Sequence, residues 1–411
     1  MPCQWSWGRG ECQQWLLPRG EPIVEAQEAA RNLGMVTFNP SRFGRNGLLL
    51  RAQPLLPSGE VQTDMSFAVF IYDGKVVAKV QDAEDARAVS LRNGDTIMVY
   101  SHAIFSRDRQ RPDSPAYAKE VVMTARYMSI DGLLGPAIKL RPPAGWPVHR
   151  FEKNWVPFLH NGILYLSYSL EPHVILRCDG AVRGVPDPNP PELVVCTQAY
   201  RSSNPEAWRP TEGLFRNLNQ PRHAKGGRGG SPLILVPGLM GNTAFASAYL
   251  GIAHFHPPDF HKQAPSYWHF FYAVQTRPPF RVSAVSPPFR FVSSRRWTGR
   301  ADRIQFAAGL QLLSRGRLAI TYGISDMLAM QTSLTLSLVS KLLRGERPLS
   351  RIVEHCTVRQ CNSTSGFPQS IVRGRRCDDE SLCEGVFNNA SLIRVRCLDE
   401  GHKAHIPTCD I

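Results

Sequence analysis

The sequence lacks the short motifs of several enzyme classes. GxSxG, HExxH and the DxD triplet do not occur in its 411 residues. A serine hydrolase of the nucleophile-elbow type, a zincin and a metal-dependent nucleotide-sugar transferase are therefore unsupported. His254 and His256 lie two residues apart, as in some metal sites, but no third ligand follows at a characteristic spacing. We expect neither a metal ion nor another cofactor.

Long hydrophobic runs are also missing. No stretch of 18 or more apolar residues occurs, so no transmembrane segment is expected. The first 20 residues show no basic segment followed by 7 to 15 apolar residues, which means that a signal sequence is not visible.

Cysteine is scarce until the last 56 residues, which hold six of the ten. Their spacing is not CxxC, so three disulfides are favoured over structural zinc, with the pairing left open. Two glycosylation sequons, at Asn362 and Asn389, lie in the same segment. These features predict a small disulfide-rich module at 346–411 and a glycoprotein of the secretory pathway lumen (Golgi) or the extracellular space. A cytosolic chain with reduced cysteines is the alternative.

The charge is basic but dispersed. Lys and Arg number 48 against 34 Asp and Glu, a formal charge of +14. Such a balance attracts phosphate, nucleotide sugars and acidic polysaccharides. The basic residues are spread along the chain, and no zinc finger, RNA-recognition or basic-zipper pattern occurs, so nucleic acid is not an expected partner.

Turn residues and short apolar runs predict an all-β fold. The chain has 33 Pro and 32 Gly, and its apolar runs recur at short intervals. Asp73-Gly74 and Asn161-Gly162 suit type I′ hairpin turns, because both central residues need φ > 0. Short helices are expected at 22–33 and, with a strand as the alternative, at 333–345.

The number of strands leaves a sandwich, a barrel or a propeller open, and the length favours a five-bladed β-propeller. We expect an N-terminal extension at 1–45, a propeller at 46–345 with a long surface insertion at 179–231, and the Cys-rich module after it.

Two polar segments could carry chemistry. In "QDAEDARAV", Glu84 and Asp85 stand beside Arg87, which is most often a solvated loop but can also hold a carboxylate for acid chemistry on a sugar. The triplet Glu152-Lys153-Asn154 offers donors to a phosphate or sugar hydroxyl ahead of an aromatic strand. His173 lies twenty residues further on, and we expect it to approach the same region from the neighbouring strand.

Taken in order, the segments resemble the five-bladed β-propeller enzymes of glycoside hydrolase family 130, which are mannoside phosphorylases and hydrolases, and the related β-1,2-mannosyltransferases. "EDAR" at 84–87 resembles the Glu-Asp-Pro-Arg motif of that group, and "EKNWVPF" resembles its Lys-Asn strand opening. "RGGSP" at 228–232 and "YLGIAH" at 249–254 resemble its Gly-rich turn and its Tyr-His-Gly segment. "FAAGL" at 306–310 and "YGISD" at 322–326 are similar to its last two motifs. Ala86 and Leu250 depart from the proline and histidine of the family.

The resemblance implies inverting transfer at a β-linked mannose, with Asp85 as the catalytic acid. It implies that Lys153, His173 and Arg228 would hold a phosphate, if phosphate takes part, and that Tyr322 and Asp326 would bind sugar hydroxyls. The remaining substrate- or phosphate-binding candidates are Glu84, Arg87, Glu152, Asn154 and His254.

The sequence therefore predicts a glycosyltransferase, phosphorylase-like or a β-mannosyltransferase, of carbohydrate metabolism. Its expected partners are an oligosaccharide or glycoprotein glycan, with phosphate, a sugar 1-phosphate or a nucleotide sugar as co-substrate. Two alternatives stay open: a secreted glycosidase, for which Glu152 or Glu171 would be the base, and a catalytically silent glycan-binding propeller.

Overall fold

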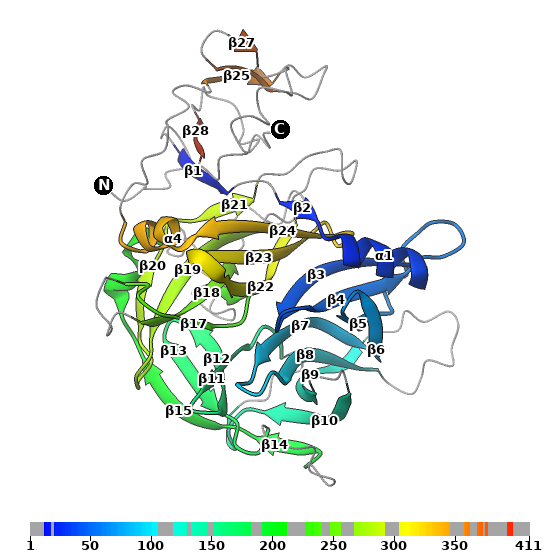
Figure 1. The fold of residues 1–411 in the computed structure, drawn as a ribbon. Helices are drawn as coiled ribbons and strands as arrows, with labels where there is room; N and C mark the ends of the chain where they lie inside the picture. Colours follow the sequence, from blue (N-terminus) through cyan, green and yellow to red (C-terminus); the bar gives the residue numbers. More distant parts are fainter. Residues whose placement is uncertain are drawn as a thin grey trace.

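The computed structural model describes residues 12–17, 20–105, 118–129, 133–146, 152–181, 191–211, 227–240, 247–255, 267–291 and 304–345, with four short strands beyond them. The described strands form five mainly antiparallel sheets, which are arranged as blades around one axis (Figure 1). The five-bladed β-propeller that the sequence predicts is thus confirmed.

Each blade has one strand near the axis and its partners further out. Blade 1 contains β3 (Met35–Phe43), β4 (Gly47–Pro54), β5 (Phe67–Tyr72) and β6 (Lys75–Gln81). Blade 2 contains β7 (Ala83–Ser90), β8 (Thr96–Phe105), β9 (Ala118–Met128), β10 (Leu134–Arg141) and β14 (Leu193–Val195). Blade 3 contains β11 (Val156–His160), β12 (Ile163–Leu170), β13 (His173–Arg177) and β15 (Thr197–Ser202).

Blade 4 is made of shorter pieces. It contains β16 (Arg228–Gly229), β17 (Ile234–Val236), β18 (Ala248–Phe255), β19 (Trp268–Gln275), β20 (Val282–Val285) and β21 (Phe289–Phe291). Blade 5 contains β22 (Gln305–Leu313), β23 (Arg317–Ile324), β24 (Leu328–Thr335) and β2 (Glu21–Pro22). The 3-10 helices η2 (Pro205–Thr211) and η3 (Ser314–Gly316) lie in connections.

The ring closes through the N-terminal part of the chain. β2 pairs with β24, so blade 5 joins the start of the chain to strands from residue 305 onward. β3, which pairs with β4, also precedes residue 46. The strands β2 and β3, within the segment expected as an N-terminal extension, thus belong to the sheets of blades 5 and 1.

Five apolar clusters fill the five interfaces between neighbouring blades. The strand β4 shows why its sequence is apolar on both faces. Leu48 and Leu50 pack toward blade 5 and helix α1 (Val24–Leu33), whereas Leu49 packs toward blade 2. Alternate side chains of a strand point to opposite faces, so a strand between two blades must be apolar at successive positions.

The predicted insertion at 179–231 is partly structural. The chain leaves blade 3 after β13, adds β14 to blade 2 parallel to β10, and returns to complete blade 3 with β15. A disulfide between Cys178 and Cys196 closes this excursion at its base. The sequence did not indicate this pair, and the six cysteines of the expected C-terminal module lie outside the described side chains.

The predicted turns and helices are confirmed. Asp73-Gly74 joins β5 to β6 and Asn161-Gly162 joins β11 to β12, with positive φ at all four residues. The helix expected at 22–33 is α1, and the segment 333–345 contains the end of β24 and the helix α4 (Leu336–Leu343).

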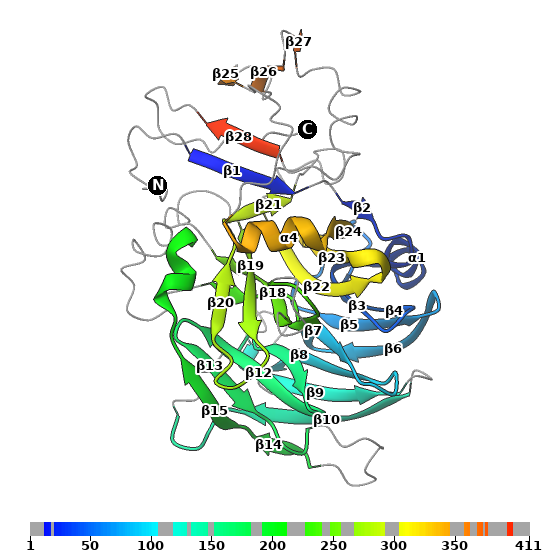
Figure 2. The same ribbon diagram turned by 60° about the vertical axis from the view of Figure 1, so that its left-hand side comes forward.

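One side of the ring carries additional elements. The helix α4 lies across blades 4 and 5, where its Val339 and Leu342 join the apolar cluster between these two blades (Figure 2). The strand β1 (Cys12–Leu17) pairs with β21 and with β28 (Ile393–Cys397). The strands β25 (Thr357–Cys361), β26 (Pro368–Val372) and β27 (Arg375–Arg376) continue that sheet.

Candidate functional site

Polar residues with unusual backbone geometry gather where the inner strands of three blades meet. Asn39, Asp85 and Asn154 have φ of 48°, 50° and 66°, and they come from β3, from β7 and from the segment before β11. The pairing register shifts around Asn39 and around Asp85, as it does at a β-bulge. Left-handed residues other than glycine cost free energy and often gather at functional sites, because a bulge re-aims a side chain.

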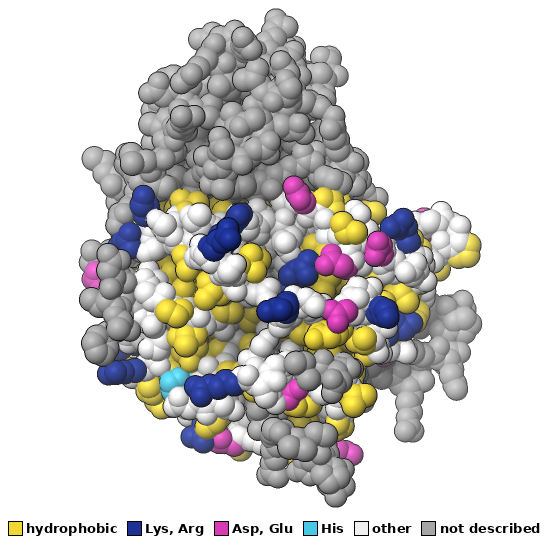
Figure 3. Space-filling model, viewed as in Figure 1, with side chains coloured by type: hydrophobic (Ala, Val, Ile, Leu, Met, Phe, Trp, Pro, Cys, Tyr) yellow, Lys and Arg dark blue, Asp and Glu magenta, His cyan; other side chains and the backbone are white. Residues whose placement is uncertain are grey.

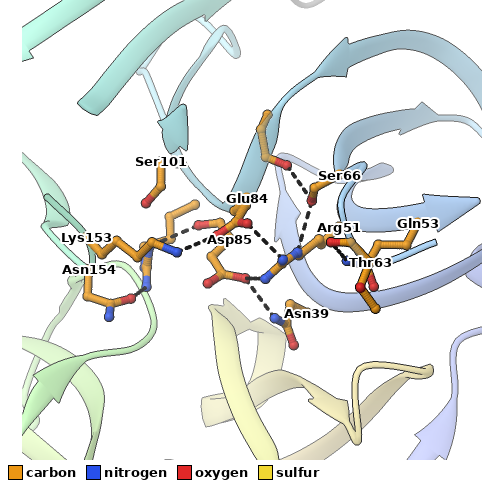
Figure 4. A network of polar contacts seen from close by, with 12 residues as sticks. Asn39, Arg51, Gln53, Thr63, Ser66, Glu84, Asp85, Ser101, Lys153 and Asn154 are labelled. Atoms are coloured by element: carbon orange, nitrogen blue, oxygen red, sulfur yellow. Dashed lines mark hydrogen bonds and ion pairs between the residues drawn. The ribbon is translucent and has the colours of Figure 1, made fainter. Parts of the chain in front are cut away.

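Asp85 lies at the centre of this arrangement (Figure 4). Its Oδ1 accepts hydrogen bonds from Asn39 Nδ2 at 2.8 Å and from Arg51 Nη1 at 3.3 Å, so blade 1 supplies both donors. The Asp85 side chain is 16% exposed, which leaves it within reach of a ligand.

Glu84 bridges two cations beside Asp85. Its Oε1 pairs with Arg51 Nη2 at 3.0 Å and its Oε2 with Lys153 Nζ at 2.7 Å. Figure 4 shows Glu84 and Asp85 between Arg51 on one side and Lys153 with Asn154 on the other. We call Asn39, Arg51, Glu84, Asp85 and Lys153 the mouth network, since its ion-paired side chains are 16–38% exposed.

The two aspartates of the site have opposite pKa shifts. Burial disfavours the charged form of Asp85, but Arg51, Arg87 and the Asn39 hydrogen bond outweigh it and hold the pKa of Asp85 below its ordinary value. Burial raises the pKa of Asp326, which Arg51 opposes and the nearby Asp85 and Glu84 carboxylates reinforce. Asp326 comes from blade 5, in the tight turn between β23 and β24, where Ser325 and Asp326 both have positive φ.

Arg87 does not belong to the accessible part of the site, although the sequence suggested a substrate contact. It is fully buried, and its guanidinium donates to carbonyl oxygens and an amide from three blades. The acceptors are the Asp85 carbonyl at 2.9 Å, Asn154 Oδ1 at 2.9 Å, the Gly229 carbonyl at 3.4 Å and the Gly230 carbonyl. We call Arg87 with these four acceptors the axial tie. Its role here is to join blades 2, 3 and 4.

The Gly-rich segment before β17 serves this contact. A Cβ at Gly229 would lie 2.1 Å from Val156 Cγ2, and a Cβ at Gly230 would lie 2.7 Å from the Ala307 carbonyl oxygen. Only glycine lets the chain approach the axis closely enough for its carbonyls to meet Arg87.

Blade 4 lines the opposite side of the site. Arg228 is exposed and pairs in register with His254, which is buried against the rings of Tyr267 and Phe306. Burial and the negative charges of Asp85 and Asp326 raise the pKa of Tyr267 to about 12. The charges of Arg228 and Asp85 thus both act on Tyr267, whereas the His254 ring packs against Tyr267 and Phe306.

Two further candidates, His173 and Tyr322, are buried in the core. His173 is buried and contacts Ser167 Oγ at 2.8 Å and the Phe280 carbonyl at 2.8 Å, and burial lowers its pKa to about 4. Tyr322 is buried, stacks on Phe291 with ring centroids 3.9 Å apart, and accepts a hydrogen bond from Gly20 N. Both side chains complete the core, and their assignment as ligand contacts stays a prediction.

The acidic candidates of blade 3 are also structural. Glu152 is buried and accepts a hydrogen bond from Trp155 Nε1 at 3.1 Å. Glu171 accepts one from Ser203 Oγ in the turn after β12. Their role as bases of the hydrolase alternative stays a prediction.

Sequence reasoning missed Asn39, Arg51 and Tyr267. Arg51 had a usable signal, since it is a lone arginine inside the apolar run "GLLLRA" of an inter-blade strand. Asn39 likewise interrupts an apolar strand, immediately before Pro40. Gly323 of "YGISD" leaves room for it, because a Cβ there would lie 2.0 Å from Asn39 Oδ1.

The described surface shows no concentration of one charge on the face in Figure 3, where Lys and Arg side chains are scattered among acidic ones. Among the residues that the structure describes, no group of three or more His, Cys, Asp and Glu side chains is placed to hold a metal ion. In the same part of the chain, no helix has the length and apolar character needed to span a bilayer.

Comparison with known proteins gives structural likenesses only. No family model matches the sequence, and no curated protein matches it. The chain is similar to a β-1,2-mannobiose phosphorylase from Listeria innocua, with 12% identity, 81% of this chain and 99% of the other covered, and a TM-score of 0.44.

Two further solved structures are similar to it. One is a GDP-Man-dependent mannosyltransferase from Leishmania mexicana, with 9% identity, 79% and 89% coverage, and a TM-score of 0.43. The other is a glycosyl hydrolase from Bacteroides ovatus, with 13% identity, 78% and 94% coverage, and a TM-score of 0.41. These identities and scores are too low to transfer an activity from any of them.

Proposed function

We propose that the protein is a carbohydrate-active enzyme that transfers a mannose-type glycosyl group with inversion at the anomeric carbon, with Asp85 as its central catalytic residue. The observation that supports this most strongly is the convergence of four blades on one partly exposed carboxylate. Asn39 and Arg51 of blade 1 bond to Asp85 of blade 2, Lys153 of blade 3 pairs with the adjacent Glu84, and Asp326 of blade 5 lies in its field.

The chemistry fits a sugar better than a metal or a nucleophilic side chain. Sugar hydroxyls both donate and accept hydrogen bonds, so they suit a site in which carboxylates, an amide and cations alternate. Inverting transfer needs one carboxylic acid to protonate the leaving oxygen while the incoming group attacks from the opposite face. Asp85 and Asp326 supply two carboxyl groups with different proton affinities, a feature typical of acid and base assignments.

Asp85 is ionised in the ligand-free protein at neutral pH, since its pKa is lowered. Its acid role therefore requires a change in its surroundings when a glycan binds. Burial raises the pKa of Asp326, so of the two carboxyl groups Asp326 holds a proton more readily. In this proposal Asp85 and Asp326 act together, with the proton passing directly or through a sugar hydroxyl.

The test uses purified protein with β-linked manno-oligosaccharides, mannose 1-phosphate and GDP-mannose as separate donors, and product analysis by mass spectrometry. Asp85→Asn should lower the transfer rate by about 100-fold to 10,000-fold. Asp73→Asn is the matched control. Asp73 has a positive φ of 48°, close to the 50° of Asp85, but it lies in an exposed hairpin turn outside the mouth network. Equal rates in the wild type and Asp85→Asn would refute the assignment.

A catalytically silent glycan-binding propeller is the second candidate, favoured by the ionised state of Asp85 in the free protein. It predicts saturable binding on a glycan array with no product from any of the three donors after long incubation. Detection of a transferred or hydrolysed product would exclude it.

We also propose a secretory-pathway or extracellular location for this activity. The disulfide between Cys178 and Cys196 supports it, because such bonds persist in oxidising compartments. Mass spectrometry of the protein from its native cell should find these cysteines bonded and Asn362 or Asn389 glycosylated. Free thiols together with bare sequons would contradict this location.

A further inference from the structure

The cations of the mouth network are already neutralised within the protein. Lys153 Nζ lies 2.7 Å from Glu84 Oε2, and Arg51 contacts both Glu84 at 3.0 Å and Asp85 at 3.3 Å. Two cations thus face two carboxylates. Glu84 uses both of its oxygens in these pairs, so it is the residue that ties the two cations together.

The other cations predicted to hold a phosphate are not available in the same way. Arg87 is buried, with its donors directed at carbonyl oxygens and Asn154, and His173 is buried against the Phe280 carbonyl. Arg228 is exposed. Among the predicted phosphate ligands that the structure describes, Arg228 is thus the exposed arginine outside the mouth network, and one arginine does not make the several charge-assisted contacts with which proteins usually clamp a phosphoryl group.

We propose that Glu84 makes this site selective for uncharged sugar hydroxyls, so that the glycosyl group passes to water or to an acceptor hydroxyl and not to inorganic phosphate. This inference rests on the proposed glycosyl transfer and names its nucleophile. The bond from the anomeric carbon to the leaving oxygen breaks, and a bond to the hydroxyl oxygen forms. The hydroxyl proton passes to a carboxylate and the leaving oxygen takes a proton from a carboxylic acid, so protons balance.

Electrostatics gives the physical reason. A phosphate dianion that reached Lys153 or Arg51 would have to displace the Glu84 carboxylate and then remain near Glu84, Asp85 and Asp326. Like charges at such short range repel strongly where water is partly excluded. A sugar hydroxyl can instead donate to a carboxylate and accept from Lys153 without breaking the pair between them.

The experiment is a calorimetric titration of inorganic phosphate into the full chain at constant ionic strength. The wild type should show no saturable binding in the millimolar range. Glu84→Gln keeps the side-chain size, removes the charge, frees Lys153 and leaves Arg51 paired only with Asp85, so it should bind phosphate at least about 10-fold more tightly. Glu84→Ala is the second variant and should gain binding in the same direction.

Glu120→Gln is the matched control. It removes one negative charge from β9, where Glu120 lies 3.8 Å from Arg141 and is 31% exposed. This variant should leave phosphate binding as weak as in the wild type. Saturable submillimolar binding by the wild type, or equal affinities of the Glu84 and Glu120 variants, would overturn the inference.

The outcome is separable from that of the proposed function, because phosphate binding is measured without turnover. A wild type that makes mannose 1-phosphate from a manno-oligosaccharide would refute the neutral nucleophile and support glycosyl transfer. A wild type that excludes phosphate and yields no product with any donor would refute the transfer and its nucleophile, and would leave only the exclusion of phosphate by Glu84.

Discussion

The mouth network and the axial tie are adjacent, yet their arginines have opposite kinds of partner. Arg51 of the mouth network pairs with the carboxylates of Glu84 and Asp85 and is 16% exposed. Arg87 of the axial tie is fully buried and donates to three carbonyl oxygens and one amide. Both arginines meet at Asp85, one at its side chain and the other at its backbone.

This difference in partners gives the two clusters different roles: the mouth network can respond to a ligand, and the axial tie supports the fold. Carboxylates titrate and can exchange partners with a ligand, so the mouth network can respond to pH and to a sugar. Carbonyl oxygens do not titrate, so the contacts of the axial tie depend on the charge of Arg87 alone. Burial lowers the pKa of Arg87 to about 10, which still leaves it charged at neutral pH. A rigid support beneath a responsive site is what precise catalysis requires.

The largest expected effect comes from breaking the axial tie. Arg87→Met should lower the free energy of unfolding by about 3–5 kcal/mol, because it leaves buried carbonyls of three blades without donors. Urea-induced unfolding followed by circular dichroism measures this change.

Arg177→Met provides the comparison for this prediction. Arg177 is 43% exposed and pairs with Asp179 at 2.8 Å on the surface. Its loss should change stability by less than about 1 kcal/mol. Similar losses from the two variants would show that Arg87 is not an inter-blade support.

The second prediction concerns the titration of two aspartates, Asp85 of the mouth network and Asp326 of blade 5. The folded-state pKa of Asp85 is lowered, so its charge contributes stability above its unfolded pKa, and this contribution is lost as pH falls through the folded value. The folded-state pKa of Asp326 is raised, so its contribution is present below the unfolded pKa and is lost as pH rises through the folded value.

Asp85→Asn should therefore destabilise the protein at pH 7, and Asp326→Asn should stabilise it, each by about 1 kcal/mol. The difference between each variant and the wild type should shrink in acid. Unfolding curves at pH 3, 5 and 7 test this, and shifts of the same sign in both variants would contradict the opposite environments assigned to the two aspartates.

The sequence was sufficient where local chemistry decides the structure. Asp73-Gly74 and Asn161-Gly162 specify hairpin turns by their tolerance of positive φ. The short apolar runs indicate an all-β fold, and the length of the chain favours a propeller among the all-β folds. The segment "EDAR" also led to Asp85, through its resemblance to the Glu-Asp-Pro-Arg motif. Arg87 was expected to contact the substrate, but its side chain is buried and bonded to protein acceptors. The sequence does not reveal which face of a strand is buried.

Contacts between distant segments were beyond local reasoning. Asn39 and Arg51 reach Asp85 only because blade 1 packs beside blade 2, 46 and 34 residues away along the chain. His173 and Tyr322 look like ligand contacts by residue type, yet inter-blade packing buries them. The closing pair of β2 with β24 joins residues about 300 apart, and a two-residue strand carries no recognisable pattern.

The smallest expected effect distinguishes the two kinds of left-handed residue. Asn39 and Asp73 both have φ of 48°, but Asp73 lies in an exposed hairpin turn and Asn39 donates to Asp85 within the mouth network. Glycine accepts this backbone conformation without strain, so Asp73→Gly should change stability by no more than about 0.5 kcal/mol. Asn39→Gly should have a comparably small effect on stability, because relief of backbone strain offsets the lost hydrogen bond. It should nevertheless raise the pKa of Asp85, since the amide stabilises the charged carboxylate. Carbon-13 NMR titration of the Asp85 carboxyl group measures this shift, and an identical titration in both glycine variants would mean that Asn39 does not tune the site.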